Sequence, residues 1–155
     1  MAASVQVHVE EPFAAGVSPG RLKTAAEVTL EAEGHSTGEL TLVITDDESL
    51  RALNRAHLGI DAPTDVLSFG GQSPEFVSPP SVDKYLGDVV IAYPQAKKQS
   101  SAAGHPLEAE LTLLVVHGVL HLLGYDHVRS EDKAVMWKRQ GEILSRLGLT
   151  RVQPA

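Results

Sequence analysis

The sequence predicts an α+β fold in one domain, with a small four-stranded mixed sheet, about five helices packed on it and a buried central helix. Three observations carry this prediction: short stretches in which hydrophobic and polar residues alternate, longer stretches with helical periodicity, and one helical stretch that is apolar on all sides. The chain has 155 residues, of which 43% are hydrophobic and 21% charged. This length and composition are typical of a single globular domain, so we expect one domain over residues 1–155.

A strand–helix–strand unit opens the chain. Hydrophobic and polar residues alternate over 5–9 and again over 40–44, which predicts two half-buried strands. A helix is expected between them over 19–33, with Ser18 as its N-cap and Gly34 at its end. Because two strands joined by a helix form a βαβ unit, we expect this first pair of strands to be parallel.

The middle of the chain supplies the next helix and two more strands. Thr45 and Glu48 have the spacing of a capping box, which predicts a helix directly after the second strand. Further strands are expected over 65–69 and 88–93. The segment 70–85 between them contains two glycines, three prolines and three serines. A connection of this length and composition predicts a functional flap or a mobile loop.

The last three predicted elements are helices. A short helix over 95–101 follows the fourth strand, and a longer one runs over 106–123. From residue 111 onward the longer helix is apolar on all sides apart from one threonine, two histidines and a glycine, so we expect it to be the buried central helix. The final helix begins at residue 130, and residues 148–155 are expected to form a frayed tail.

Composition excludes several classes of protein. The chain has no cysteine, which excludes a disulfide scaffold, a cysteine-ligated zinc site and a thiol nucleophile. It contains no apolar run close to the roughly 20 residues that span a bilayer, and no signal-peptide pattern at its start. We therefore expect a cytoplasmic protein with no membrane partner.

Charge is distributed unevenly along the chain. The formal net charge of −7 argues against a protein that binds nucleic acids indiscriminately. Residues 128–155, however, carry six basic and three acidic side chains. A polyanionic partner would meet this part of the chain most favourably, and the alternative is a solvated helix face.

The strongest chemical signal is a group of three histidines within eleven residues. His117 and His121 are four residues apart, so their side chains share one face of a helix. Gly124 favours the end of that helix, after which the chain can turn back and bring His127 to the same point. Three imidazoles leave one tetrahedral position for water, which is typical of catalytic zinc sites. Zinc is the expected metal because the donors are imidazoles without a thiolate.

The alternative is that these histidines are only hydrogen-bonded residues of the core. A shared metal ion is the better explanation, because two unpaired imidazoles in the most apolar helix would otherwise cost several kcal/mol. The spacing also matches the metzincin protease pattern at every ligand and at the glycine, but Gly118 stands where the protease has its general-base glutamate. Since glycine cannot accept a proton, we expect peptide hydrolysis by that route to be lost.

The segment 117–127 resembles the signature H-G-x-L-H-L-x-G-Y-D-H of the YbeY-type bacterial endoribonucleases, with every fixed residue present. Four upstream segments follow the pattern of the same family, and the resemblance covers roughly residues 40–147. These segments are Leu53-Asn54, Asp61, Pro63-Thr64-Asp65-Val66-Leu67-Ser68-Phe69 and Leu86-Gly87-Asp88-Val89-Val90-Ile91.

The resemblance implies a single-domain α+β fold with one zinc ion per chain, held by His117, His121 and His127. It also implies hydrolysis of single-stranded RNA in ribosomal RNA maturation, at the 3′ end of small-subunit rRNA, and in ribosome quality control. The implied partners are ribosomal RNA and the ribosome or its assembly factors. We expect the water bound to zinc to be the nucleophile, and the residues alone assign no general base.

One departure from the family pattern concerns the phosphate contact. The family usually has an arginine between the Leu-Asn and Pro-Thr segments, and this chain has Leu58 there. Arg51 or Arg55 could replace it, or the cation could come from Lys97, Lys98 or the basic C-terminal helix. If none of these residues supplies a cation to the phosphate, we expect catalysis to be weak.

Further candidate residues complete the predicted site. Asp126 is expected to support a ligand histidine by a hydrogen bond, and the alternative is that it caps the turn. Ser68, Lys138 and Arg139 are candidate substrate-binding residues, whereas Asp65 is expected to be structural. Two other functions remain open: a non-catalytic ribosome-assembly or RNA-binding module with a structural zinc, and a metalloprotease-like hydrolase.

Overall fold

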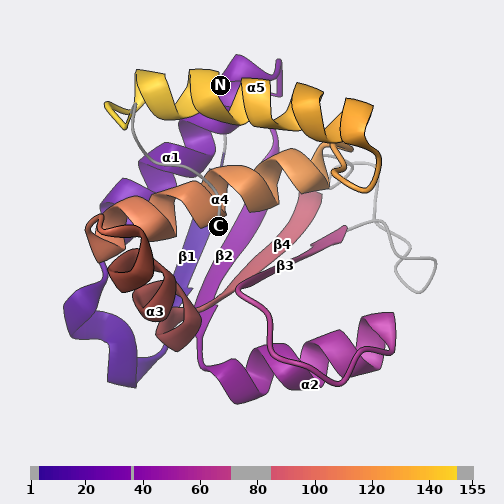
Figure 1. Ribbon diagram of the computed structural model, residues 1–155. Helices are drawn as coiled ribbons and strands as arrows, with labels where there is room; N and C mark the ends of the chain where they lie inside the picture. Colours follow the sequence, from indigo (N-terminus) through magenta and orange to yellow (C-terminus); the bar gives the residue numbers. More distant parts are fainter. Residues whose placement is uncertain (1–3, 36, 71–84, 150–155) are drawn as a thin grey trace.

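The computed structural model describes residues 4–35, 37–70 and 85–149 (Figure 1). One sheet of four strands, in the order β1-β2-β4-β3, forms its centre. The strands are β1 (Ser4–Val9), β2 (Glu39–Thr45), β3 (Val66–Gly70) and β4 (Tyr85–Ala92). The helices are a 3-10 turn η1 (Glu11–Gly16), α1 (Pro19–Ala32), α2 (Asp47–Leu58), α3 (Tyr93–Ala103), α4 (Leu107–Leu122) and α5 (Ser130–Arg146).

The sheet is mixed, as the sequence predicts. Strands β1, β2 and β4 are parallel, so the predicted parallel pair β1–β2 is confirmed. Strand β3 runs antiparallel to β4 at the edge of the sheet, with Val66 opposite Ile91 and Ser68 opposite Val89. This edge strand therefore places Ser68 directly beside the middle of β4.

Helices cover both faces of the sheet. On one face lie α1 and α4, with α3 packed against α4 and α5 lying across the outer side of α4 (Figure 1). Helix α2 covers the other face. Residues of β4 alternate accordingly: Val89 and Ile91 belong to the core on the α4 side, whereas Val90 and Ala92 pack with Leu50 of α2.

Helix α4 is the buried central helix that the sequence predicts. Leu111, Val115 and Val119 pack in the core between this helix and the sheet. Val116 and Leu120, on another side of the helix, pack in the core shared with α5. The helix is apolar all round because neighbouring elements cover it on several sides.

Several predicted boundaries are corrected by the structure. The N-cap of α2 is Asp46, which accepts a hydrogen bond from the Ser49 backbone N–H at 2.7 Å, and Thr45 is still part of β2. Tyr93 opens α3 instead of ending β4, because Pro94 in the first turn favours the start of a helix. The turn η1 was not predicted.

The predicted frayed tail is wrong at its beginning. Gly148 has a left-handed φ of 80°, and the Leu149 backbone N–H donates to the Leu144 carbonyl at 2.8 Å. Leu149 also packs against the core beside α5. Residues 150–155 of the tail and residues 71–84 of the predicted flap lie outside the described residues. None of the described helices combines the length and the hydrophobicity needed to cross a bilayer.

Candidate metal centre

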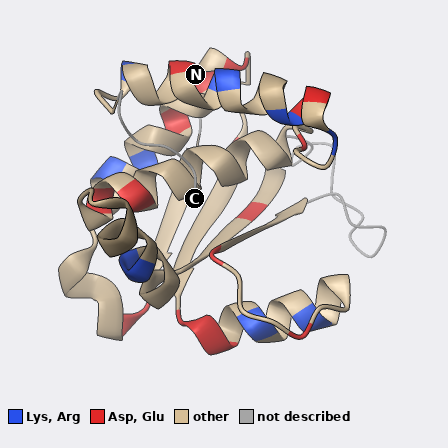
Figure 2. Ribbon diagram, viewed as in Figure 1, with Lys and Arg blue, Asp and Glu red and all other residues tan. Residues whose placement is uncertain are grey.

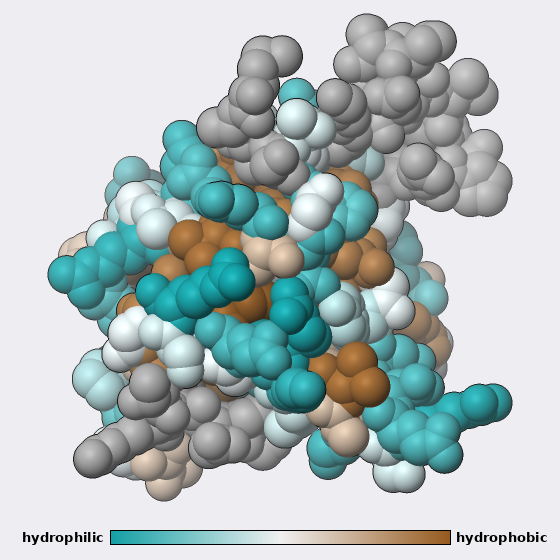
Figure 3. Space-filling model, turned by 90° about the horizontal axis from the view of Figure 1, so that it is seen from above, coloured by the Kyte–Doolittle hydropathy of each residue, from teal (hydrophilic) through white to brown (hydrophobic). Residues whose placement is uncertain are grey.

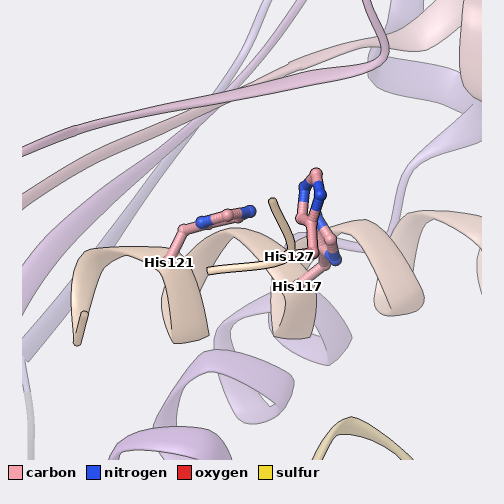
Figure 4. Close-up of side chains that lie close together, drawn as sticks. All are labelled: His117, His121 and His127. Carbon is pink, nitrogen blue, oxygen red and sulfur yellow. The ribbon is translucent and has the colours of Figure 1, made fainter. Parts of the chain in front are cut away.

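Three histidines converge at the C-terminal end of α4 (Figure 4). His117 and His121 project from the helix, and His127 lies in the turn that follows it. One ring nitrogen from each histidine can be chosen so that all three lie within 4.8 Å of one another. Three converging imidazole nitrogens form a donor set that fits a transition-metal ion. The histidines predicted as ligands are therefore the ones that the fold brings together.

A left-handed glycine makes this convergence possible. Gly124 has a φ of 104°, a backbone conformation that residues with a Cβ rarely adopt. Its N–H donates to the His121 carbonyl at 3.0 Å. The Tyr125 N–H then donates to the Leu120 carbonyl at 3.1 Å, closing the helix end. The chain turns back from this point and delivers His127 to the face of α4 that carries the other two rings.

Asp126 caps this turn. Its Oδ1 accepts a hydrogen bond from the backbone N–H of His127 at 2.7 Å. Of the two roles that the sequence left open for Asp126, the hydrogen bond found in the structure is the turn cap, and not a bond to an imidazole. Asp126 therefore acts on the backbone of the turn that carries His127.

Helix α5 supplies a second set of contacts to the histidines, which the sequence did not predict. Nδ1 of His117 lies 3.0 Å from Oε1 of Gln140, a residue that is 1% exposed. The ring of Trp137 lies edge-on to His117 and to His127, with centroid distances of 5.7 and 5.6 Å. The sequence did contain one indication of the contact between Gln140 and His117. Gln140 is a polar residue on a helix face that is otherwise apolar and includes Met136 and Leu144.

Burial keeps two of the imidazoles neutral. It lowers the pKa of His117 to about 4, with the nearby charge of His121 acting in the same direction. Burial also lowers the pKa of His121, again helped by a neighbouring imidazole, His127. Both rings are therefore neutral at pH 7, which is the form of histidine that binds metals.

A groove of about 550 Å³ opens beside the three histidines. Its walls include Ser68, whose hydroxyl donates to the Gly118 carbonyl at 2.8 Å, and the exposed side chains of Leu58 and Ile60. Among the described residues that line this groove there is no lysine or arginine. Leu58, at the position where the sequence pattern led us to expect an arginine, is 60% exposed and presents an apolar side chain to the groove.

Asp65 is the carboxylate among the described residues of the groove wall. It also borders a smaller cavity of about 200 Å³, which is lined by His117, Trp137 and the buried Glu110. The Gln99 side-chain amide donates to Asp65 Oδ2 at 3.2 Å, and the Ala92 backbone N–H donates to the Asp65 carbonyl at 2.9 Å. These bonds hold Asp65 beside the histidines, a placement that the sequence did not predict.

The absence of a glutamate at position 118 has a packing reason. A Cβ built on Gly118 would lie 2.4 Å from Val89 Cγ1 and 3.3 Å from Ser68 Oγ. Helix α4 therefore approaches β4 too closely for a side chain at this position. A glutamate, which is the general base of the metzincin pattern, cannot be accommodated at position 118 because α4 packs directly against β4 there.

The structure does not bring the two predicted basic residues of α5 to the groove. Arg139 is engaged elsewhere: its Nε donates to Glu33 Oε2 at 2.8 Å and its Nη1 donates to Glu142 at 2.7 Å. Lys138 is exposed, and neither residue is among those lining the groove. Charges of both signs lie along α5 (Figure 2), and hydrophilic residues with small hydrophobic patches cover the face of the molecule on that side (Figure 3).

The candidate replacements for the family arginine are also outside the groove wall. Arg51 is paired with Asp61, with Nε 2.8 Å from Oδ1. Arg55, Lys97 and Lys98 are exposed, and none of them lines the groove. The described part of the groove therefore has no cation to replace the guanidinium.

Comparison with known proteins identifies the family. The family model "Endoribonuclease YbeY" matches residues 17–148. The chain is 47% identical over 152 residues to a Roseiflexus sp. protein described as endoribonuclease YbeY, covering 96% of this chain and 95% of the relative. A Chloroflexus aggregans protein with the same description is 43% identical over 155 residues, covering 97% of this chain and 100% of the relative.

A solved structure supports the fold. The solution structure of a Thermotoga maritima protein aligns with a TM-score of 0.57 at 20% sequence identity, covering 96% of each chain. At that identity the match speaks for the fold alone, whereas the family match spans most of the sequence. The chain belongs to the endoribonuclease YbeY family.

Proposed function

We propose that this protein is a zinc-dependent endoribonuclease that cuts single-stranded RNA during ribosomal RNA maturation and ribosome quality control. The observation that carries the proposal is the convergence of His117, His121 and His127 beside a groove, in a chain of the endoribonuclease YbeY family. The three histidines are the proposed metal ligands. Zinc is favoured over other metals because three imidazoles and no thiolate suit a four-coordinate site with one open position.

The metal centre and Asp65 on the groove wall are proposed to contribute different parts of the chemistry. A zinc ion at this centre would supply Lewis-acid chemistry, favouring ionisation of water and offsetting negative charge on the phosphate. Asp65, held by Gln99 on the groove wall, is the residue proposed to accept a hydrogen bond from the attacking water and then its proton. The P–O bond to water forms as the P–O bond to the leaving nucleoside breaks, and the leaving oxygen takes a proton from solvent.

The groove walls indicate how RNA would be held. Leu58 and Ile60 present apolar surface, which suits the faces of unstacked bases in a single strand. Without a lysine or arginine on the described walls, phosphate binding would depend mainly on the metal centre. Lys138, exposed on α5, is a proposed outer contact for the RNA backbone, whereas Arg139 is occupied by Glu33.

The metalloprotease-like alternative is disfavoured by Gly118. The close approach of Val89 leaves no room for the glutamate that this chemistry needs. The second alternative is a non-catalytic module of ribosome assembly with a structural zinc. It predicts that the zinc-loaded protein does not cut RNA, so a cleavage assay distinguishes it from the proposed function.

The test is cleavage of an unstructured RNA and of a perfect RNA duplex by the zinc-loaded protein. The variant His117→Ala removes a ligand, and His8→Ala is a matched control because His8 is an exposed residue on β1. We expect the wild type and His8→Ala to cut the single strand and to contain one zinc ion per chain, and His117→Ala to lose both properties. A protein that binds zinc but leaves RNA intact would support the non-catalytic module instead.

The biological substrate needs a second measurement. In cells without the protein, we expect ribosomal RNA precursors with unprocessed 3′ ends of the small-subunit RNA to accumulate. Expression of the wild type would restore mature ends and expression of His117→Ala would not. Mature ends in the absence of the protein would contradict a role in this maturation step.

A further inference from the structure

Helix α5 carries a polar and an aromatic residue directly behind the three histidines. Gln140 faces His117, and Trp137, three residues earlier on the same helix, faces both His117 and His127. The rest of this face is apolar and packs in the core with α4 through residues such as Met136 and Ile143. Helix α5 therefore touches the candidate metal centre as well as the core.

A buried glutamine at this position is costly unless it has a partner. Gln140 is 1% exposed, and burying an amide without a hydrogen bond costs about 1–3 kcal/mol in proteins. A methionine or leucine would fill the same space without that cost. The contact that Gln140 makes instead is the one to His117 Nδ1 at 3.0 Å.

This contact favours one tautomer of the neutral His117 ring. The oxygen Oε1 of Gln140 can only accept a hydrogen bond, so a neutral imidazole that forms this bond carries its proton on Nδ1. The lone pair of that ring then lies on Nε2. A hydrogen bond of this kind from a histidine ligand also fixes the orientation of the ring and raises its basicity as a donor.

Trp137 acts on the histidine that is otherwise least restrained. His127 is exposed and lies in a turn, whereas His117 and His121 are half-buried on a helix. The edge-on contacts of Trp137 with His117 and His127, at interplanar angles of 85° and 74°, limit the rotation of both rings. The ammonium group of Lys133 lies over the indole of Trp137, with Nζ 5.3 Å from the ring centroid.

We propose that Gln140 and Trp137 are positioning residues, which hold the metal-binding imidazoles in their binding orientation before a metal arrives. Gln140 selects Nε2 of His117 as the ligand atom, and Trp137 restricts His127. The proposal rests on the metal centre of the proposed function and does not depend on RNA cleavage.

The first test measures zinc affinity by competition with a chromophoric chelator. The variant Gln140→Met keeps the approximate volume of the side chain and removes the oxygen that accepts the hydrogen bond from His117, whereas Gln140→Glu keeps an accepting oxygen. Met136→Leu, a change within the same buried face of α5, is the matched control. We expect Gln140→Met to bind zinc about 10–100-fold more weakly, and Gln140→Glu and Met136→Leu to stay within a few-fold of the wild type. The variant Trp137→Leu is expected to show a smaller loss.

The second test reads the tautomer of His117 directly in zinc-free wild-type protein. Long-range ¹H–¹⁵N NMR spectra distinguish a protonated Nδ1 from a protonated Nε2. We expect His117 to carry its proton on Nδ1 in the wild type and to lose this preference in Gln140→Met. A purely structural role for Gln140 would not require a particular tautomer.

The outcomes separate this inference from the proposed function. If the wild type binds no zinc, the proposed function fails and the tautomer of zinc-free protein still decides the role of Gln140. If the wild type binds zinc and Gln140→Met binds it equally well, the positioning role is wrong. Protonation of Nε2 in the wild type would also overturn it, even if Gln140→Met failed to fold.

Discussion

Gly118 and Val89 are in such close contact that a Cβ on the glycine would lie 2.4 Å from Cγ1 of the valine. This contact brings the helix that carries two of the candidate ligands against the central part of the sheet. It also excludes the general base that a metzincin has at this position. One packing contact thus positions two of the candidate ligands and leaves no room for a glutamate at position 118.

This contact predicts that Gly118→Ala destabilises the protein although alanine is the better helix former. Overpacking a well-packed core costs about 1–3 kcal/mol, which exceeds the gain in helix propensity of roughly 1 kcal/mol. Gly141→Ala on α5 is the matched control, because a Cβ there meets nothing within 4 Å. Urea unfolding should show a loss of stability for Gly118→Ala and a gain for Gly141→Ala. Equal gains for both variants would mean that α4 can move away from β4 without cost.

The lowered pKa of His117 predicts that the zinc-free protein is sensitive to mild acid. The folded-state pKa is about 4 and the ordinary value is 6.5, so between these pH values the unfolded chain binds a proton that the folded chain does not. The free energy of unfolding therefore falls as the pH decreases from about 6.5 to about 4, by as much as about 3 kcal/mol.

Urea unfolding of zinc-free wild type and His117→Gln at pH 7, 5.5 and 4.5 measures this contribution. We expect the stability difference between the two proteins to shift in favour of His117→Gln as the pH decreases. A difference that stays constant would show that the His117 ring is accessible to protons in the folded protein. The variant His8→Ala serves as a control that should follow the wild type.

The position of Asp65 predicts a loss of turnover that is separate from metal binding. In Asp65→Asn, kcat for RNA cleavage should fall by about 100-fold or more, because the variant cannot accept the proton of the attacking water. Zinc content and KM should change little, since Asp65 is not one of the three converging ligands. Asp61→Asn, on the same connection but paired with Arg51, is the control and should retain turnover. Loss of zinc from Asp65→Asn would instead identify Asp65 as a metal ligand.

The apolar groove wall predicts a gain of RNA affinity when a cation is introduced there. Leu58→Arg would place a guanidinium beside the metal centre, at a position that is 60% exposed. One additional phosphate contact should raise the affinity for single-stranded RNA and steepen the plot of log K against log salt by about 0.7. Ala52→Arg, which adds the same charge to an exposed position of α2 outside the groove wall, is the control. An equal effect of both variants would show only a change in overall charge.

Local patterns in the sequence were sufficient to predict the four strands and the α-helices of the described residues, though not the turn η1, and the convergence of the histidines. Alternation at period two and repeats at period 3.6 reflect which side chains are buried, so they predicted the four strands and the buried helix α4. The order strand, helix, strand predicted that the first pair is parallel. The spacing of His117 and His121, with Gly124 after them, predicted that His127 returns to the same face. These features depend on residues close together in the chain, and the structure contains them.

Only the tertiary structure brought together residues that are distant in the sequence. Gln140 reaches His117 because α5 packs across α4, and Asp65 reaches the histidines because β3 lies at the sheet edge beside β4. Arg139, which local charge made a candidate for RNA binding, is instead bound by Glu33 at the end of α1. A local pattern records whether a side chain is buried, but the partner it meets is decided by how the helices and the sheet pack.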